Sequence, residues 1–196
     1  MRVCILGSPR SGTTSLYKYL TNSLELEGLN EPYNKRMDQR FGKRNLTEYD
    51  IWERDNLVVK HLSMQLDRNQ IPLLEEHFDK IVLIYREDVK SASESWLCGN
   101  YSGNWDKKYN YNDIICRYDE DEAKFLLETD MKERYKDIEF YKTLPFFTVT
   151  YENLFYSDKD KIRLKEYFNI TDNKFDFYFD IKNKLRQEKS LPKTII

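Results

Sequence analysis

The residues with the clearest chemical potential lie close to the amino terminus, where residues 7–14 read GSPRSGTT. This segment holds two glycines, one arginine and four hydroxyl side chains, and it follows an apolar run at residues 2–6. Glycines let a backbone approach an anion, hydroxyls donate hydrogen bonds to it, and the fork of Arg10 can hold two oxygens. A helix starting after the second glycine would add its unpaired amides and its positive dipole end. The pattern therefore predicts a phosphate-binding loop, with a tight turn of purely structural glycines as the alternative.

The residue after the second glycine limits which phosphate compounds this loop could bind. The glycine spacing matches the Walker A loop, G-x-x-x-x-G-K-[ST], but Thr13 stands at the lysine position. In that loop the lysine holds the β- and γ-phosphates, and the next hydroxyl holds Mg²⁺. Without the lysine, a protein that transfers the γ-phosphate of ATP would lose its main contact with the transferred group. The sequence therefore favours a donor that has no γ-phosphate.

Several segments resemble the sulfotransferases that use 3′-phosphoadenosine 5′-phosphosulfate (PAPS). PRSGTT is similar to the family's 5′-phosphosulfate loop. KIVLIYREDVKSASESW at residues 80–96 is similar to its 3′-phosphate element, a strand that ends in arginine before a serine-bearing helix, and TVTYENL at residues 148–154 is similar to its later strand. VVKHLSMQL at residues 58–66 resembles the cytosolic enzymes' strand with a lysine and the catalytic histidine. NEPYN at residues 30–34 resembles the Glu-Pro segment of bacterial and carbohydrate-type members, so the resemblance covers about residues 2–155.

This resemblance implies a reaction and a set of donor contacts. The reaction is the transfer of a sulfuryl group from PAPS to a hydroxyl or amine of an acceptor, which releases 3′,5′-ADP and needs no metal. The 3′-phosphate would be bound by Arg86 with Ser93 or Ser95, and we favour Ser95, because Glu94 stands where the family commonly has its serine. The 5′-phosphosulfate would be bound by the loop and the first turn of the helix: Arg10, Ser11, Gly12, Thr13, Thr14 and Ser15.

Two residues are candidates for the base that removes the acceptor proton, Glu31 and His61. A histidine titrates near neutral pH, whereas a glutamate needs burial to raise its pKa into that range. We favour Glu31 slightly, because NEPYN matches the smaller bacterial-type members; a loop carboxylate and a strand histidine without chemistry are the alternatives. Lys60 and Arg10 would stabilise the leaving phosphate. Because adjacent strand residues point to opposite faces, Lys60 and His61 can share a site only where the strand ends or bulges.

Strands and helices alternate along the chain in the manner of a parallel α/β sheet. Apolar runs predict strands at residues 2–6, 57–62 and 80–86, and within 145–154. Helical spacing predicts helices at about residues 13–26, 67–78, 88–98, 111–142 (as two helices) and 158–168. The predicted fold is one three-layer α/β domain over residues 1–196, and the resemblance makes it P-loop NTPase-like. The remaining expectations are that Gly28 closes the first helix, that residues 29–56 are irregular and that residues 99–105 form a loop.

The composition excludes several classes of protein. The charges nearly cancel, with a net charge of −2, which argues against a globally basic nucleic-acid binder. The apolar runs are too short to span a bilayer, and the amino terminus lacks the pattern of a signal peptide. Three widely spaced cysteines favour free thiols in a reducing compartment over disulfides or a zinc site. We therefore expect a cytoplasmic protein that does not bind nucleic acid.

The acceptor is the least defined part of this interpretation. The basic segment at residues 35–44 and the aromatic residues Trp96 and Trp105 are candidate contacts for an anionic or sugar acceptor. A solvated loop and ordinary packing are the alternatives for these residues. Two other functions also stay open at this point: a P-loop nucleotide or nucleoside kinase with an altered loop, and a nucleotide-binding module without catalysis.

Overall fold

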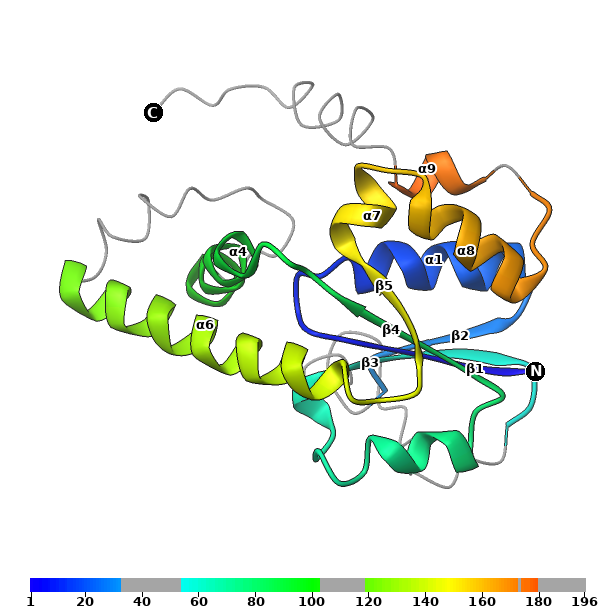
Figure 1. Cartoon of the computed structure of the whole chain (residues 1–196), viewed down its shortest axis with the longest axis horizontal. Helices are drawn as coiled ribbons and strands as arrows, with labels where there is room; N and C mark the ends of the chain where they lie inside the picture. Colours follow the sequence, from blue (N-terminus) through cyan, green and yellow to red (C-terminus); the bar gives the residue numbers. More distant parts are fainter. Residues whose placement is uncertain (33–53, 103–118, 173, 180–196) are drawn as a thin grey trace.

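The described part of the chain is built around one parallel β-sheet (Figure 1). In this computed structural model the described residues are 1–32, 54–102, 119–172 and 174–179. Within them the sheet has five strands: β1 (Arg2–Gly7), β2 (Glu27–Asn30), β3 (Leu57–Leu62), β4 (Lys80–Tyr85) and β5 (Phe147–Thr150). The strand order is β2-β3-β1-β4-β5, and every neighbouring pair is parallel. The central position of β1 explains why Val3, Cys4, Ile5 and Leu6 are all fully buried.

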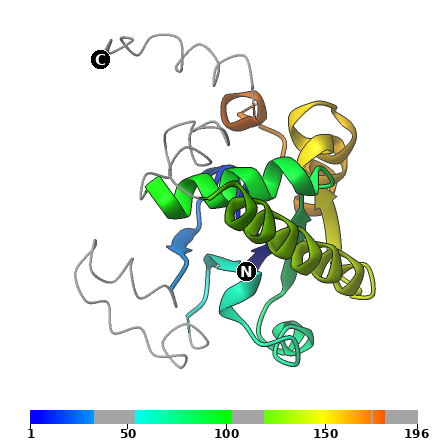
Figure 2. The ribbon, with the colours of Figure 1, turned by 90° about the vertical axis from the view of Figure 1, so that its left-hand side faces the viewer.

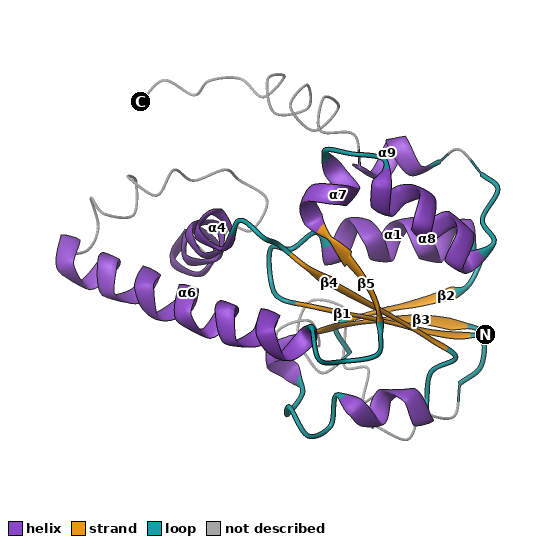
Figure 3. Ribbon diagram, in the orientation of Figure 1, coloured by secondary structure: helices purple, strands orange, loops and turns teal. Residues whose placement is uncertain are grey.

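Helices cover both faces of the sheet and give three layers (Figure 3). One face is covered by α1 (Thr13–Ser23), α7 (Tyr151–Phe155), α8 (Lys159–Phe168) and α9 (Phe175–Phe179). The other is covered by the 3₁₀ helix η2 (Pro72–Glu76) and the carboxyl end of α6 (Glu120–Tyr141). Alternate strand residues divide between the two cores: Val3 and Ile5 pack on the α1 side, and Cys4 and Leu6 pack on the η2 side. The predicted three-layer α/β fold is confirmed.

Two helices lie side by side beyond the carboxyl ends of the strands, α4 (Val89–Ser102) and α6 (Figures 1 and 2). A small apolar cluster of Leu97, Cys98 and Leu127 joins them. Asp88 caps α4 by accepting a hydrogen bond of 3.0 Å from the amide of Ser91. This pair of helices places α4 next to the edge of the sheet where the strands end.

The strands β1, β3 and β4 lie where the sequence predicts them, and β5 lies within residues 145–154, but β2 corrects the prediction. The first helix ends at Ser23, and Glu27–Asn30 form a strand instead of the expected helix end and irregular segment. Gly28 therefore serves packing rather than helix termination, because a Cβ there would collide with the hydroxyl of Tyr17. Only Leu29 of this short edge strand is buried, so the pattern of apolar residues is too weak to predict a strand here.

Several helix boundaries also differ from the predictions. The helix expected at residues 67–78 is reduced to η2, which starts at Pro72, and a second 3₁₀ helix, η1 (Ser63–Gln65), follows β3. α4 continues through residue 102, so the first part of the expected loop at 99–105 is helical. The aromatic stretch near the carboxyl terminus forms α9, which the sequence did not indicate. The basic segment at residues 35–44 and Trp105, both candidate acceptor contacts, lie outside the described residues. α6 is one helix from residue 120 onward, and residues 111–118 of the segment expected to hold two helices also lie outside the described part.

No helix in the described ranges combines the length and the apolar character that crossing a membrane requires.

Candidate phosphate-binding site

The predicted phosphate loop lies at the edge of the sheet where three neighbouring strands end. Gly7 at the end of β1 is in register with Leu62 of β3 and with Ile84 of β4. In Figure 1 the strands run from right to left, and the segment that joins β1 to α1 lies at the left end of the sheet. Because parallel strands bring their carboxyl ends to one edge, Arg10, Lys60 and Arg86 are brought to the same end of the sheet.

The backbone of this loop is tightly constrained. A Cβ at Gly7 would collide with the carbonyl oxygen of Ile84, so only glycine allows β1 and β4 to approach here. Gly12 has a φ of 88°, and a Cβ there would lie 2.8 Å from the ring of Phe155. Arg10 also has a left-handed φ, 67°, which is uncommon for a residue with a side chain. Both glycines are therefore required by geometry, and the loop carries strain at the arginine that the sequence assigns to phosphate.

Ser11 holds the loop in this conformation. Its hydroxyl donates to the carbonyl oxygens of Ser8, at 2.5 Å, and of Ile84, at 3.3 Å, and its amide also donates to Ser8. The side chain is fully buried. The hydroxyl expected to bind phosphate is therefore engaged within the protein, where it fixes the loop to itself and to β4.

The first turn of α1 supplies backbone amides that could bind an anion. The helix begins at Thr13, and its N-cap residue, Gly12, makes no side-chain capping hydrogen bond. The first amides of a helix have no partner inside it, so they point toward a ligand together with the positive end of the dipole. Thr13, at the Walker lysine position, is buried, and its methyl carbon faces Gly7, whereas Thr14 is exposed. The amides and the Thr14 hydroxyl are thus the donors that this turn offers.

Lys60 and Glu31 form a buried ion pair beside that turn. The Nζ atom of Lys60 lies 2.6 Å from Oε1 of Glu31 and donates to Oγ1 of Thr14 at 3.0 Å. The side chain of Lys60 is only 3% exposed and that of Glu31 is 13% exposed. Burial lowers the pKa of Lys60, and the attraction of the Glu31 carboxylate opposes that shift. Glu31 has a left-handed φ of 50°, and its amide donates to the carbonyl of Lys60, which locks the two residues together.

His61 lies on the opposite face of the sheet from Lys60. β3 continues without interruption to Leu62, and Lys60 is in register with Ile5 whereas His61 is in register with Leu6. Ile5 and Leu6 belong to different cores, so the two neighbouring side chains diverge. Burial lowers the pKa of His61 to about 4, which keeps the imidazole neutral at neutral pH. Of the two candidate bases, only Glu31 lies beside the loop with Lys60.

Arg86 follows directly after β4 and is loosely held. Its guanidinium nitrogens lie 3.8 Å from Asp88 and 3.9 Å from Glu152, longer than direct hydrogen bonds. The Nε atom is buried and makes no hydrogen bond to any described residue. The guanidinium also lies over the ring of Tyr151, 4.6 Å from its centroid. A buried donor of this kind is costly unless a partner arrives, so Arg86 is suited to bind an anionic group.

Two serines of α4, Ser93 and Ser95, differ in their hydrogen bonding. Ser95 accepts a hydrogen bond of 2.7 Å from Nε of Arg10, so it is linked to the phosphate loop. Ser93 is fully buried, and its hydroxyl has no hydrogen-bond partner among the described residues. The structure therefore joins Ser95 to Arg10 across the site and leaves Ser93 as a buried donor on the same helix.

Two residues that sequence reasoning missed organise the site. Glu152 accepts hydrogen bonds from the amides of Glu87, at 3.0 Å, and Asp88, at 3.1 Å, and so holds the turn that carries Arg86. Arg134 of α6 is buried and donates to the carbonyl of Pro9 in the loop at 2.8 Å. The resemblance of YENL points to the segment that contains Glu152 but does not indicate what this residue does. Nothing local in the sequence connects Arg134 with a loop 125 residues away.

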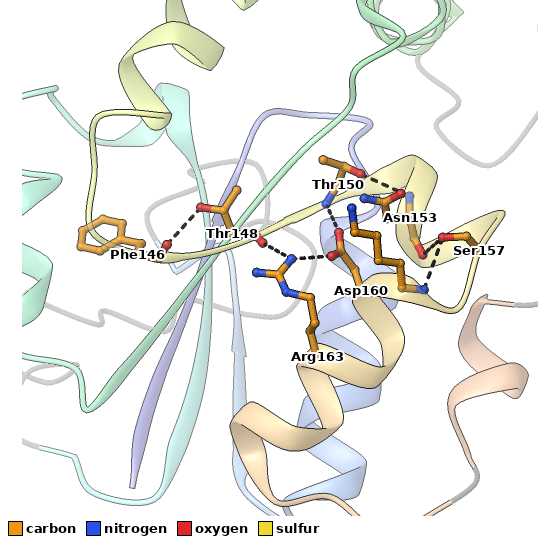
Figure 4. Close-up of polar contacts among 8 residues, drawn as sticks. Phe146, Thr148, Thr150, Asn153, Ser157, Asp160 and Arg163 are labelled. Atoms are coloured by element: carbon orange, nitrogen blue, oxygen red, sulfur yellow. Dashed lines mark hydrogen bonds and ion pairs between the residues drawn. The ribbon is translucent and has the colours of Figure 1, made fainter.

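Behind the site, a network of polar contacts clamps β5, α7 and α8 together (Figure 4). Asp160, 1% exposed, accepts from the amide of Thr150 at 2.9 Å and from Arg163 at 2.6 Å. The hydroxyl of Thr150 accepts from the amide of Asn153 at 3.2 Å and caps α7. We call these residues, Thr150, Asn153, Asp160 and Arg163, the β5 clamp. It fixes the segment from which Glu152 reaches the site.

Comparison with known proteins identifies the fold. No protein-family model matches the chain, and no curated protein sequence matches it. Shikimate kinase from Bacteroides thetaiotaomicron is similar in structure with a TM-score of 0.52, at 13% identity over 87% of this chain and 99% of that one. A sulfotransferase domain from the curacin biosynthetic pathway gives a TM-score of 0.49, at 17% identity over 91% of this chain and 77% of that domain. A sulfotransferase domain from the Synechococcus PCC 7002 olefin synthase gives 0.44, at 16% identity over 100% and 89%.

These similarities concern the arrangement of the elements. The chain shares with the shikimate kinase the arrangement of a parallel β-sheet flanked by helices. At such low sequence identity a shared fold leaves the reaction open, because unrelated activities occur on one fold. The choice of function therefore depends on the residues of the site.

Proposed function

We propose that this chain is a sulfotransferase that moves a sulfuryl group from PAPS to a hydroxyl or amine of a small-molecule acceptor. The observation that carries the proposal is Arg86, a loosely paired and mostly buried cation at the strand end next to the phosphate loop. A donor with two separate anionic groups needs a second cation at this place. Thr13, buried where ATP-binding loops have lysine, supports the same choice. The resemblance of the loop and the Arg86 segment to this family points to the same donor.

The donor contacts follow from where the loop leaves hydrogen-bond donors available. In this proposal the 5′-phosphosulfate is held by Arg10, by the amides at the start of α1 and by the hydroxyl of Thr14. Ser11 and Gly12 shape the loop, and Ser15 contributes its amide. The 3′-phosphate is held by Arg86, with Ser93 or Ser95 of α4 adding a hydroxyl. The product 3′,5′-ADP keeps all of these contacts except those to the sulfuryl oxygens.

The transfer step then uses the ion pair beside the loop. The acceptor oxygen or nitrogen attacks sulfur in line, and its new bond to sulfur forms as the bond from sulfur to the bridging phosphate oxygen breaks. The departing electron pair stays on that phosphate oxygen, where Lys60, Arg10 and the helix amides stabilise the negative charge. The acceptor proton moves to the carboxylate of Glu31, which lies on the loop side of the sheet. His61, on the other face, has no part in this step.

Nucleotide binding tests the donor assignment. We expect 3′,5′-ADP to raise the melting temperature more than 5′-AMP at equal concentration, because only the former has a 3′-phosphate. Arg86→Ala should lower the affinity for 3′,5′-ADP by about tenfold or more, the usual range for a hydrogen bond to a charged group, and should abolish the preference. Arg68→Ala is a control, since Arg68 is 52% exposed and its carboxylate partner is Asp137, near the carboxyl end of α6. An equal response of the wild-type protein to both nucleotides would refute the donor assignment.

Catalysis is tested separately from binding. Transfer of [³⁵S]sulfate from PAPS to a broad panel of hydroxyl and amine acceptors should be detectable for the wild-type protein. Glu31→Gln should lose most of that transfer while it still binds 3′,5′-ADP. Tight donor binding without transfer to any acceptor would instead identify a non-catalytic binding module. Turnover of ATP that depends on Mg²⁺ would identify a kinase.

A further inference from the structure

Lys60 contacts the residue that stands at the metal-binding position of loops with this glycine spacing. In G-x-x-x-x-G-K-[ST] the last residue provides the hydroxyl that binds Mg²⁺, and Thr14 stands at that position. Here the Nζ atom of Lys60 lies 3.0 Å from Oγ1 of Thr14 and 2.6 Å from the carboxylate of Glu31. A cation thus already contacts the hydroxyl and a neighbouring carboxylate, and it is covalently attached to β3.

The surroundings of Lys60 are those of a hard cation. The hydroxyl of Thr14 and the carboxylate of Glu31 are oxygen ligands of the kind that Mg²⁺ and Mn²⁺ prefer. Asn30 is in register with Lys60, so its side chain lies on the same face, and its amide oxygen is buried without a hydrogen-bond partner in the described part of the chain. A protein ammonium among such oxygens fills the space and satisfies the charge.

The position of Lys60 is rigid. Its strand is paired on both sides, with β1 and with β2, and its side chain is nearly inaccessible to solvent. A divalent cation at Thr14 would lie close to this positive charge, and charges of the same sign repel strongly at short range where water is excluded.

We propose that Lys60 acts as a built-in cation that takes the place of a divalent metal at Thr14 and excludes metal from the phosphate loop. The identity of the anion that it neutralises rests on the proposed function, whereas the exclusion of metal depends only on Lys60, Thr14 and Glu31. Replacing Lys60 by a neutral residue converts this position into a site for a hard divalent cation. The wild-type protein binds its nucleotide independently of metal.

Binding of Mn²⁺, followed by the electron paramagnetic resonance signal of the free ion, tests the proposal without any nucleotide. We expect negligible binding to the loop of the wild-type protein, and binding at least about tenfold tighter in Lys60→Met, which keeps the volume of the stem and removes the charge. The double variant Lys60→Met/Glu31→Gln should lose the gained affinity. Lys18→Ala is the matched control, because Lys18 is exposed on α1 and acts on Lys60 only through its charge.

The possible outcomes separate this inference from the sulfotransferase assignment. Wild-type protein that binds Mn²⁺ as tightly as Lys60→Met refutes it, and so does an equal gain in Lys18→Ala. A Lys60→Met protein that is folded by circular dichroism but does not gain affinity also refutes it; if that variant does not fold, Lys60→Gln replaces it, and the wild-type titration decides by itself. In a second arm, 3′,5′-ADP binding to the wild-type protein should not change between EDTA and saturating Mg²⁺. Failure of 3′,5′-ADP to bind at all would refute the donor assignment and leave the Mn²⁺ result valid.

Discussion

We call the edge of the sheet that carries Arg10, Glu31, Lys60 and Arg86 the phosphate edge. The phosphate edge and the β5 clamp are both polar, but they differ in how closely their charged groups are paired with protein partners. In the clamp, Asp160 receives two direct hydrogen bonds, of 2.9 Å and 2.6 Å, and the backbone around it is regular (Figure 4). At the phosphate edge, the nearest carboxylate oxygens lie 3.8 Å and 3.9 Å from Arg86. Left-handed backbone conformations occur there at Arg10 and Glu31. The clamp therefore satisfies its polar groups internally. At the phosphate edge Lys60 and Arg10 have direct partners, but Arg86 is only loosely paired and the backbone is strained.

This difference teaches where to look for function in the chain. Backbone strain and a loosely paired, mostly buried cation such as Arg86 cost stability, so they persist where a ligand uses them and where the surrounding structure fixes them. The β5 clamp provides part of that support, because it holds the segment from which Glu152 reaches the turn of Arg86. Substitutions in the clamp should therefore change stability, and substitutions at the phosphate edge should change ligand binding.

The largest effect on stability is expected from Asp160→Ala. The substitution removes a buried acceptor, leaves the amide of Thr150 without its partner and separates Arg163 from its carboxylate. We expect the free energy of unfolding to fall by about 3 kcal/mol, whereas the affinity of the remaining folded protein for 3′,5′-ADP should change little. Denaturant unfolding and nucleotide titration measure the two quantities. Asp158→Ala is the control, because that carboxylate is 78% exposed, and a similar loss of stability in it would contradict the clamp.

The strands that the sequence predicts correctly are those with strong local patterns. RVCIL, LVVKHL and KIVLIY are nearly continuous apolar runs, and the structure buries them at the centre of the sheet as β1, β3 and β4. The sequence does not predict β2, because Leu29 is its only buried residue. This strand is defined by its pairing with β3 and not by a local pattern of apolar residues. The aromatic helix α9 forms because Phe175 and Phe179 pack against Tyr19, a contact that no local rule contains.

The site shows the same limit. The sequence draws attention to Arg10 through the composition of its loop, and to Lys60 and Arg86 through the resemblance of their segments to the sulfotransferases. The contacts that decide their roles join distant segments: Lys60 to Thr14 across 46 residues and Arg134 to Pro9 across 125. Local spacing also cannot reveal that the Ser11 hydroxyl turns inward to Ile84, since this depends on the neighbouring strand.

A second prediction concerns His61 and the dependence of the free energy of unfolding on pH. Burial lowers the pKa of His61 to about 4 from its usual 6.5, so the unfolded chain binds the proton more readily than the folded one between these values. The contribution to the free energy of unfolding is complete above pH 6.5 and declines as the pH falls, by about 2 kcal/mol between pH 6.5 and 5. Denaturant unfolding at a series of pH values should show this slope. It should be largely absent in His61→Gln and largely kept in His77→Gln, which alters a half-buried histidine. A slope that is unchanged in His61→Gln would show that other groups produce it.

The smallest expected effect concerns Arg134, which shares a feature with each region. Its guanidinium has protein hydrogen-bond partners, as the residues of the β5 clamp do, and it contacts the strained phosphate loop. Its guanidinium bridges Asp130, at 2.6 Å, and the carbonyl of Pro9, at 2.8 Å, next to the left-handed Arg10. Arg134→Met should lower the free energy of unfolding by about 1–2 kcal/mol, and it should weaken 3′,5′-ADP binding by about tenfold because the loop is no longer held for the donor. Arg134→Lys should restore part of the affinity, whereas Lys132→Met, a matched change at an exposed position of α6, should alter neither quantity. A loss of stability without any loss of affinity would place Arg134 with the clamp rather than with the site.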